Sequence, residues 1–468
     1  MADFDITVVH PEYEEYSASW AMMRHAIEGE DEIKEEGETY LPMKSGIKAM
    51  TDIGRQNAAY KAYKDRAEFP EIVSPTVQGA VGLIHAKPTE IELPKGMEYL
   101  RERATKDGLT LDGLNQRLTT EVMRMGRYGL MPGVDEKGVF HIAGYSAESV
   151  RNWDDPNGVL SYLVLDESGK VRDPATNEWK SDGRYRECYL NDVGAFTSRE
   201  WVKKHDIKGK DQWEPGEETL STIKGRKPLS FIPFTFVGST DLTPNPDDIP
   251  LYGLAKLAIR AYRLDADYVN ALHMTSEPTP WVSGVDKDSA PKSIGAHSLW
   301  VLPGEGAKAG MLEFTGQGIS AQEKAIQNTL ERAIMFGAQL FSDTRKTAES
   351  GEAKKIRLGS QHASLRSVAI TSASGLEKCL RNIAIWSGED PNKVVVKPNL
   401  DFVDHTLEPQ EILALVSAWQ AGAYSKQSLF ENLQRGEIIN PDRSFDDEEE
   451  LIQSDPALAN LGAIPQGV

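Results

Sequence analysis

The chain has 468 residues and a mass of 51.8 kDa, enough for roughly two or three hydrophobic cores. Its hydrophobic content of 40% and charged content of 26% are typical of a globular protein. No segment approaches the ~18 consecutive apolar residues of a membrane helix, and no signal peptide is expected. The net charge of −20 argues against tight nucleic-acid binding. It is compatible with a surface past which DNA slides without adhering, because like charges repel.

The two cysteines, Cys188 and Cys379, lie far apart in the sequence. They cannot form a framework of disulfides, so we expect synthesis in a reducing, intracellular compartment.

The first 130 residues have helical patterns. Residues 11–29 predict an amphipathic helix, and an acidic linker follows at 30–38. Residues 55–85 predict two helices separated at Pro70. The apolar stripe of the first helix is Tyr13, Tyr16, Trp20, Met23 and Ile27.

A further helix is predicted to start at a cap formed by Asp112 and to end at Gly126 or Gly129. Its apolar stripe is Leu114, Leu118, Val122 and Met125.

Residues 130–240 change to short β-type runs separated by Asp, Gly, Asn and Pro. Residues 166–169 and 173–177 are typical of hairpin turns. Four tryptophans are predicted to anchor a β core: Trp153, Trp179, Trp201 and Trp213.

The last half contains the longest helical patterns. A polar linker at 241–250 precedes a strong helix at 251–276, and short strands and turns fill 277–318. A long helix, a charged loop of roughly a dozen residues and a second long helix (358–388) follow from 319. Connections inside compact domains usually have about 4–6 residues, so this loop indicates an element that projects into a channel or cleft. A strand at 394–403 and two shorter helices complete the pattern.

Catalytic signatures are absent from the sequence. There is no phosphate-binding G-x-x-x-x-G-K-[ST] loop, no H-E-x-x-H, no C-x-x-C and no G-x-S-x-G. The glycine-rich residues 304–310 open no helix and predict a hairpin tip. The acidic pair Asp247–Asp248 is interpreted as solvated linker. We therefore expect no enzyme activity, no metal and no cofactor.

The order of elements at 231–430 resembles the core of tailed-bacteriophage portal (head-to-tail connector) proteins. The segments that carry this resemblance are YLPMKSG (40–46), YKAYKDRAEFPEIVSPTVQGAVGLIHAKP (60–88), residues 232–284, and the helix–charged loop–helix of 319–386.

The resemblance implies an α+β portal fold that assembles as a ring. It has an α/β wing, paired long stem helices, a small β-rich clip and a short helical crown. The implied divisions are wing 1–240, linker and first stem helix 241–276, clip 277–318, second stem helix 319–341, tunnel loop 342–357, channel helix and wing strand 358–405, and crown with acidic C-terminal tail 406–468.

The implied function is a dodecameric channel at one vertex of the virion capsid, through which double-stranded DNA is packaged and ejected. The implied partners are terminase, major capsid and scaffold proteins, and head-completion or adaptor proteins, with no membrane; synthesis would take place in the host cytoplasm. In the tunnel loop, candidate phosphate contacts are Arg345, Lys346, Lys354, Lys355 and Arg357. Acidic residues that would keep these contacts weak are Asp343, Glu349 and Glu352, and Ser350 and Gly351 would give the loop its freedom. Lys324, Arg332 and Glu323 are further candidates for the lumen.

Other interpretations remain open. The charged loop also fits a solvated loop that never touches DNA. A different non-catalytic capsid assembly or scaffold-type protein would share the acidic composition without needing a tunnel loop. A nucleic-acid-processing enzyme would need its site scattered over distant segments.

Overall fold

The computed structural model describes residues 4–205, 211–223, 227–276, 279–286, 288, 290–293, 299–302, 305–312, 316, 318–341, 363–400, 402, 409–436, 438–440 and 443–454. The chain divides into two units, residues 1–400 and 401–468. Among the described residues, no helix combines the length and the apolar character needed to cross a bilayer.

The first unit combines α-helices with antiparallel strands, so the α+β class expected from the sequence is confirmed. Its α-helices are α1 (Pro11–Glu28), α2 (Glu30–Glu35), α3 (Ser45–Lys48), α4 (Ile53–Arg66), α5 (Val73–Ile84), α6 (Leu111–Met125), α7 (Tyr252–Ser276), α8 (Ile319–Phe341) and α10 (Ala363–Ser387). Short 3₁₀ turns are η1 (Gly37–Thr39), η2 (Lys95–Arg101), η3 (Ala147–Ser149), η4 (Pro156–Gly158) and η5 (Pro391–Lys393).

The larger sheet has the strand order β10-β9-β8-β5-β4, with β11 also pairing with β9. Its strands are β4 (Val150–Asp154), β5 (Tyr162–Asp166), β8 (Arg184–Leu190), β9 (Phe196–His205), β10 (Asp211–Pro215) and β11 (Thr219–Leu220). A second sheet has the order β14-β2-β3, with strands β2 (Arg127–Val134), β3 (Phe140–Ser146) and β14 (Thr235–Gly238). The remaining pairs are β1 (Glu90–Glu92) with β17 (Val395–Lys397), β6 (Gly169–Arg172) with β7 (Trp179–Asp182), β12 (Thr222–Ile223) with β13 (Lys227–Pro228), and β15 (Thr279–Ser283) with β16 (Lys308–Leu312).

Helix α1 confirms the stripe predicted at 11–29. His10 accepts the backbone N–H of Glu12, and Pro11 occupies the first turn, where its missing N–H costs nothing. Trp20 and Met23 are fully buried. The predicted linker at 30–38 is wrong, because its acidic residues form α2 and the turn η1. Gly29, at φ 107°, lets the chain fold from α1 directly into α2.

Helix α6 confirms the second predicted stripe, whose side chains are all buried. Its cap is Thr110, whose hydroxyl accepts the N–H of Gly113, so the predicted cap at Asp112 is wrong by two residues. The helix ends at Gly126, which has φ 71° and donates its N–H to the carbonyl of Val122.

The tryptophan prediction holds for two of its four members. Trp153 and Trp201 are buried, whereas Trp213 is half-buried and Trp179 is exposed on the β6–β7 hairpin. Trp153 stacks against His10 at 3.9 Å and carries the buried Arg127 guanidinium over its ring at 4.1 Å. It therefore joins the N-terminal arm to the start of β2.

The two predicted hairpin turns have different outcomes. Residues 173–177 do join β6 to β7. Residues 166–169 do not form a hairpin, because β5 pairs with β4 and β8, whereas β6 pairs with β7 alone. Local turn chemistry marks where a strand ends, but the partner is chosen by packing.

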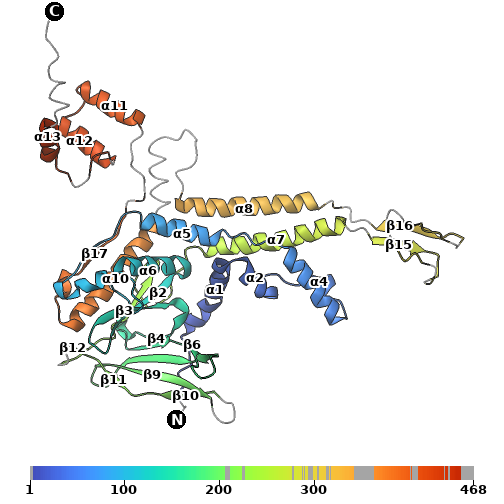
Figure 1. Ribbon diagram of the computed structural model, residues 1–468, viewed down its shortest axis with the longest axis horizontal. Coiled ribbons are helices and arrows are strands. Elements are labelled where there is room, and N and C mark those ends of the chain that lie inside the picture. The colour runs from blue at the N-terminus through green and yellow to red at the C-terminus, as the bar shows by residue number, and fades with distance from the viewer. Residues whose placement is uncertain are drawn as a thin grey trace, which may run out of the picture. The chain divides into compact units, whose positions relative to one another are not determined.

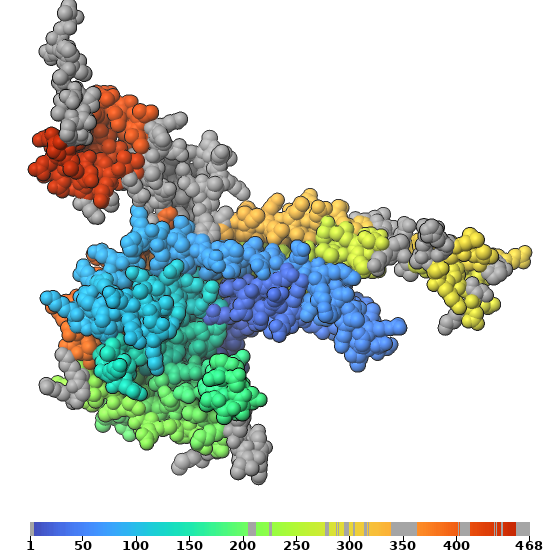
Figure 2. Space-filling view, in the orientation of Figure 1, coloured from blue at the N-terminus to red at the C-terminus, as the bar shows by residue number. Residues whose placement is uncertain are grey.

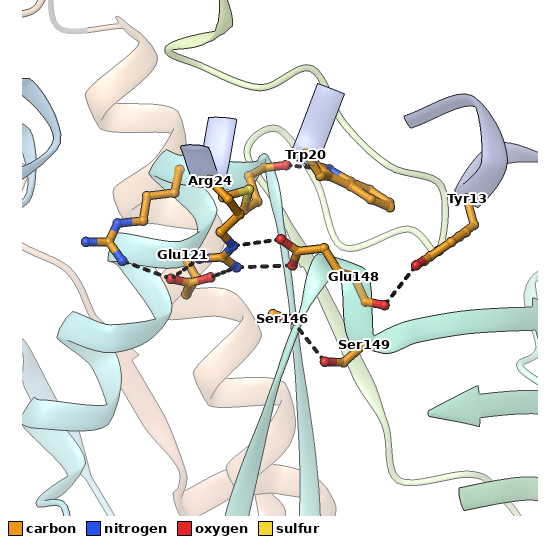
Figure 3. A network of polar contacts seen from close by, with 9 residues as sticks. Tyr13, Trp20, Arg24, Glu121, Ser146, Glu148 and Ser149 are labelled. Atoms are coloured by element: carbon orange, nitrogen blue, oxygen red, sulfur yellow. Dashed lines mark hydrogen bonds and ion pairs between the residues drawn. The ribbon is translucent and has the colours of Figure 1, made fainter. Parts of the chain in front are cut away.

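A polar cluster fastens α1 to the sheets (Figure 3). Arg24 of α1 donates to Glu121 of α6 at 2.6 Å and to Glu148 of η3 at 2.6 Å. The indole N–H of Trp20 donates to the carbonyl of Met125 at 3.1 Å, and the hydroxyl of Tyr13 donates to the carbonyl of Glu148. Burial by itself would raise the pKa of Glu148, but the hydrogen bonds and charge of Arg24 lower it overall.

The second unit is a small group of helices, α11 (Pro409–Gln420), α12 (Lys426–Arg435) and α13 (Phe445–Ser454). Ser425 caps α12 by accepting the N–H of Ser428. Phe430 and Phe445 meet edge to face at 5.5 Å and form the centre of the unit. Among the described residues of 409–454, these helices confirm the helices predicted after residue 406.

Replacing Arg24 with Met should destabilise the protein by about 1–3 kcal/mol at pH 7, because two partly buried carboxylates lose their main partner. The folded-state pKa of Glu148 is depressed, so this stabilisation is complete above the ordinary carboxyl pKa and is lost as pH falls through the lower folded value. Urea unfolding at pH 7 and pH 3 measures both effects.

The matched control is Lys61→Met, which breaks the exposed pair between Lys61 and Asp65 and should cost less than about 0.5 kcal/mol. Equal losses in both variants, or a loss from Arg24→Met that does not shrink at pH 3, would contradict the assignment.

Candidate functional site: the paired long helices

The linker before α7 is an ordered turn rather than solvated chain. Asp247 accepts the backbone N–H of Thr240 at 2.7 Å and of Asp241 at 3.2 Å, and Ser239 donates to the carbonyl of Asp248. The interpretation of Asp247–Asp248 as solvated residues is therefore wrong for Asp247, which is half-buried. Burial raises its pKa, although the two N–H donors oppose the rise. The turn fixes the direction in which α7 leaves the sheets.

Helices α7 and α8 lie side by side and antiparallel (Figure 1). At the inner end of the pair, a Cβ on Gly253 would come within 2.9 Å of the ring of Phe336. At the outer end, Gly316 lies against both Ile319 and Thr275. The helix predictions at 251–276 and 319–341 are thus confirmed. At ~1.5 Å per residue α7 is about 37 Å long.

The buried side chains of α7 are mostly small. They are Leu254, Ala255, Ala258, Ile259, Ala261, Tyr262, Ala266 and Ala271. On α8, Thr329 and Ala333 are buried. Small side chains let neighbouring elements pack closely on a helix, and α7 packs on α1, α4 and α5 as well as on α8.

Two further contacts brace α7 from its side. Asp267 accepts a hydrogen bond from Tyr63 of α4 at 2.8 Å and an ion pair from Lys44 at 2.9 Å. Arg263 donates to the carbonyl of Tyr40 at 2.5 Å. Burial, followed by the bond to Asp267, raises the pKa of Tyr63, so this phenol stays a donor at physiological pH.

A large part of the surface of the helix pair is apolar and uncovered. Ile334 and Met335 of α8 are 67% and 46% exposed, and Met274 of α7 is 50% exposed. In Figure 2, the orange surface of α8 lies open along the helix pair. Ile334 and Met335 are neighbours near the inner end of α8, whereas Met274 lies near the outer end of α7. Exposed apolar side chains along a helix pair are suited to contact with another chain.

The hairpin of β15 and β16 lies beyond the outer end of the helices (Figure 1). Trp281 packs over Gly310, its cross-strand partner, at about 3.0 Å from the position of a Cβ. Exposed apolar side chains in this segment are Trp281, Leu299, Val301, Met311 and Leu312. An isolated two-stranded hairpin is marginally stable, so this hairpin also requires neighbours.

Helix α10 connects the pair to the sheets. Gly375 allows it to lie directly on β14, because a Cβ there would meet Val237 at 2.4 Å. Ser367 donates to the carbonyl of Ser239, and the indole of Trp386 donates to the carbonyl of Thr222. Both cysteines are buried and free, in agreement with the absence of a disulfide framework, and burial raises the pKa of the Cys188 thiol to about 12.

The residues assigned to the tunnel loop lie outside the described residues. They are Asp343, Arg345, Lys346, Glu349, Ser350, Gly351, Glu352, Lys354, Lys355 and Arg357. The loop assignment therefore stays a prediction. Of the further lumen candidates, Glu323, Lys324 and Arg332 are exposed on α8.

Sequence reasoning missed a basic stripe on α7. Lys256, Arg260 and Arg263 line one groove together with His25 and Glu36. Their spacing of four and three residues places them on one face of a helix, and this spacing was the available signal.

Comparisons with known proteins give limited matches. The model of a family described as a domain of unknown function (DUF4055) matches residues 250–387, which contain the helix pair and the whole of α10. No curated protein matches the sequence.

Two solved structures are similar. The neck of an empty GTA particle computed with C6 symmetry has 14% identity and a TM-score of 0.36, covering 77% of this chain and 88% of that chain. The neck of a native GTA particle computed with C12 symmetry has 13% identity and a TM-score of 0.35, covering 76% and 87%. Likeness at this level assigns neither fold nor function.

Two glycines near the helix pair provide a test of close packing. Alanine at Gly337 meets only ordinary contacts with Thr76 and should gain up to about 1 kcal/mol from helix propensity. Alanine at Gly253 must displace Phe336 and should be at least about 1 kcal/mol less stable than Gly337→Ala. Urea unfolding of the two variants measures the difference, and equal stabilities would show that α7 and α8 are not tightly packed at Phe336.

Proposed function

We propose that this chain is the subunit of a portal-type ring, a homo-oligomeric channel at a capsid vertex through which double-stranded DNA passes. The single observation that carries the proposal is the antiparallel pair of α7 and α8 with an uncovered apolar surface and a hairpin at its outer end. The segments that resemble portal proteins include this pair. In this proposal the helices are the stem and the β15–β16 hairpin is part of the clip.

The uncovered surface supports assembly on physical grounds. Ile334 and Met335 on α8 and Leu312 on β16 expose apolar area along the helices and the hairpin. Each exposed apolar side chain gains about 1.5–3 kcal/mol when fully buried, so repetition of this contact around a closed ring would stabilise the assembly substantially. Closure uses the same two surfaces on every subunit and leaves no free end.

The channel mechanism is mechanical and electrostatic. A charge at one position in each subunit becomes a belt of charge around the axis. In the proposal, the cations Arg345, Lys346, Lys354, Lys355 and Arg357 of the tunnel loop make transient contacts with phosphates. The overall charge of −20 opposes adhesion, so DNA slides rather than binds.

The packing of α7 on α8, α1, α4 and α5 would keep the channel wall rigid while DNA moves. We place terminase and head-completion proteins at the clip, where Trp281, Leu299 and Val301 expose apolar surface. The alternative, a capsid assembly or scaffold-type protein, needs neither a ring nor a loop that contacts DNA.

Ring formation should depend on the exposed face of α8. Ile334→Glu should reduce the fraction of rings at least tenfold, because burying an unpaired carboxylate at each interface is costly. Native mass spectrometry and electron-microscope class averages measure the fraction, together with capsid components if the purified chain alone is monomeric.

The control is Val193→Glu, at an apolar position on a turn of the β-rich region that is 84% exposed, against 67% for Ile334. A wild-type chain that stays monomeric even with capsid components would overturn the ring, and intact rings from Ile334→Glu would overturn the assigned interface.

Replacing residues 343–355 with a short Gly-Ser loop should leave rings intact and abolish DNA packaging. The substitution removes four of the five proposed phosphate contacts but none of the residues in the helix pair. Packaging is measured as nuclease-protected DNA per particle. Unimpaired packaging in intact rings would remove the tunnel-loop assignment and favour the assembly-protein alternative.

A further inference from the structure

Three side chains from two helices converge beside the long helix pair. The imidazole Nε2 of His25, on α1, lies 4.0 Å from a carboxylate oxygen of Glu32 and 3.9 Å from one of Glu36. One possible ligand atom from each residue lies within 4.8 Å of the other two. Glu32 is on α2 and Glu36 follows one helical turn later, so both carboxylates project from the same face. The direct turn at Gly29 brings that face against His25.

The two carboxylates, Glu32 and Glu36, lie in an electrostatically unfavourable arrangement when both are charged. Within the described part of the chain, the only basic group at ion-pair distance from Glu32 or Glu36 is His25. Two carboxylates this close repel each other unless a cation lies between them.

The ring of His25 is held from its other side. Its Nδ1 lies 2.8 Å from the hydroxyl of Tyr40, a side chain that is 5% exposed. A protonated Nδ1 donating to this oxygen turns the Nε2 lone pair toward the carboxylates. Histidines that bind metals are commonly oriented in this way by a hydrogen bond from the second ring nitrogen.

We propose that His25, Glu32 and Glu36 form a zinc-binding site. One imidazole nitrogen and two carboxylate oxygens are a set that Zn²⁺ accepts, with water in the fourth position. Bond lengths of about 2.0–2.2 Å in a tetrahedron require ligand atoms about 3.3–3.6 Å apart. The His25–glutamate separations of 3.9 and 4.0 Å need a contraction of a few tenths of an ångström. The two carboxylates lie within 4.8 Å of each other and need a contraction of up to about 1.5 Å, which rotation of the partly exposed glutamate side chains supplies.

The site is open to solvent on one side. His25, Glu36 and Tyr40 line a groove of about 710 Å³, so the ion and its water can enter. Lys256, Arg260 and Arg263 line the same groove, and their charges reduce the affinity for a cation. One of them, Arg263, donates a hydrogen bond to the carbonyl of Tyr40.

The bound ion would act as a staple between α1 and α2. Tyr40, which orients His25, also anchors Arg263 of α7 through its carbonyl. The ion therefore stabilises the contact between α1 and α2, and α1 in turn packs on α7. The proposal does not depend on ring formation or on passage of DNA.

Zinc binding to the full chain, stripped of metal with a chelator, tests the proposal. Competition with a chromophoric chelator should give one Zn²⁺ per chain with a Kd below about 10 µM. His25→Gln and Glu36→Gln should each weaken binding at least about 100-fold, and Tyr40→Phe about tenfold. Cobalt(II) added to the stripped wild-type chain should give the intense visible absorption of a four-coordinate site.

Glu35→Gln is the matched control, because Glu35 is exposed on the same helix outside the cluster. It removes one negative charge and should bind zinc as the wild type does. Circular dichroism verifies that each variant is folded; Glu36 has a partly exposed side chain, so Glu36→Gln should not disturb folding.

Three results would overturn the proposal. A wild-type chain without stoichiometric zinc binding leaves His25 as a partner of the carboxylates in an ordinary ion pair. Wild-type affinity in His25→Gln and Glu36→Gln places the zinc elsewhere. Equal weakening by Glu35→Gln reduces the effect to general surface charge.

Discussion

The close antiparallel contact between α7 and α8 is the constraint on which the rest of the first unit depends. Phe336 fits against Gly253 near one end of the pair, and Gly316 lies against Thr275 near the other. Two helices packed this closely bury one lengthwise stripe of each helix. The opposite side of each helix must be covered by other elements or stay exposed to solvent. Helices α1, α4 and α5 cover part of the pair, whereas Ile334, Met335 and Met274 remain exposed. The two helices form a rigid element by packing on each other, but they leave apolar side chains exposed. A subunit that assembles with other chains needs such an exposed apolar surface.

The direction of the pair is set by contacts that are distant in sequence. The turn at Asp247 fixes the start of α7, and Ser367 of α10 binds the same turn through the carbonyl of Ser239. From the other side, Tyr63 and Lys44 hold Asp267. Force applied along the helices would thus be transmitted into the sheets through several separate hydrogen bonds. This rigidity suits a channel wall better than it suits a hinge.

The N-terminal helix α1 packs on α2, α6 and α7. Arg24 ties α1 to α6 and η3, and the next residue, His25, faces α2. These neighbouring residues point to different surroundings because successive positions on a helix are about 100° apart. The first makes a permanent ion-pair cluster, and the second lies in a groove that opens to solvent. Helix α1 therefore carries both a stabilising ion-pair residue, Arg24, and one ligand of the proposed zinc site, His25.

The sequence by itself determined the local elements of this protein. The stripes of α1 and α6, the break at Pro70, the end of α6 at Gly126 and the two long helices all follow from periodicity and from the backbone preferences of Gly and Pro. Tertiary structure decided which strand pairs with which, so that residues 166–169 are no hairpin and Trp179 is exposed. It also turned the acidic residues 30–38 into a helix facing His25 and made Asp247 the centre of a turn. The physical reason is that hydrophobic period and turn chemistry act over a few neighbouring residues. Partners 97 and 124 positions away, Glu121 and Glu148 for Arg24, are chosen only when the chain is packed.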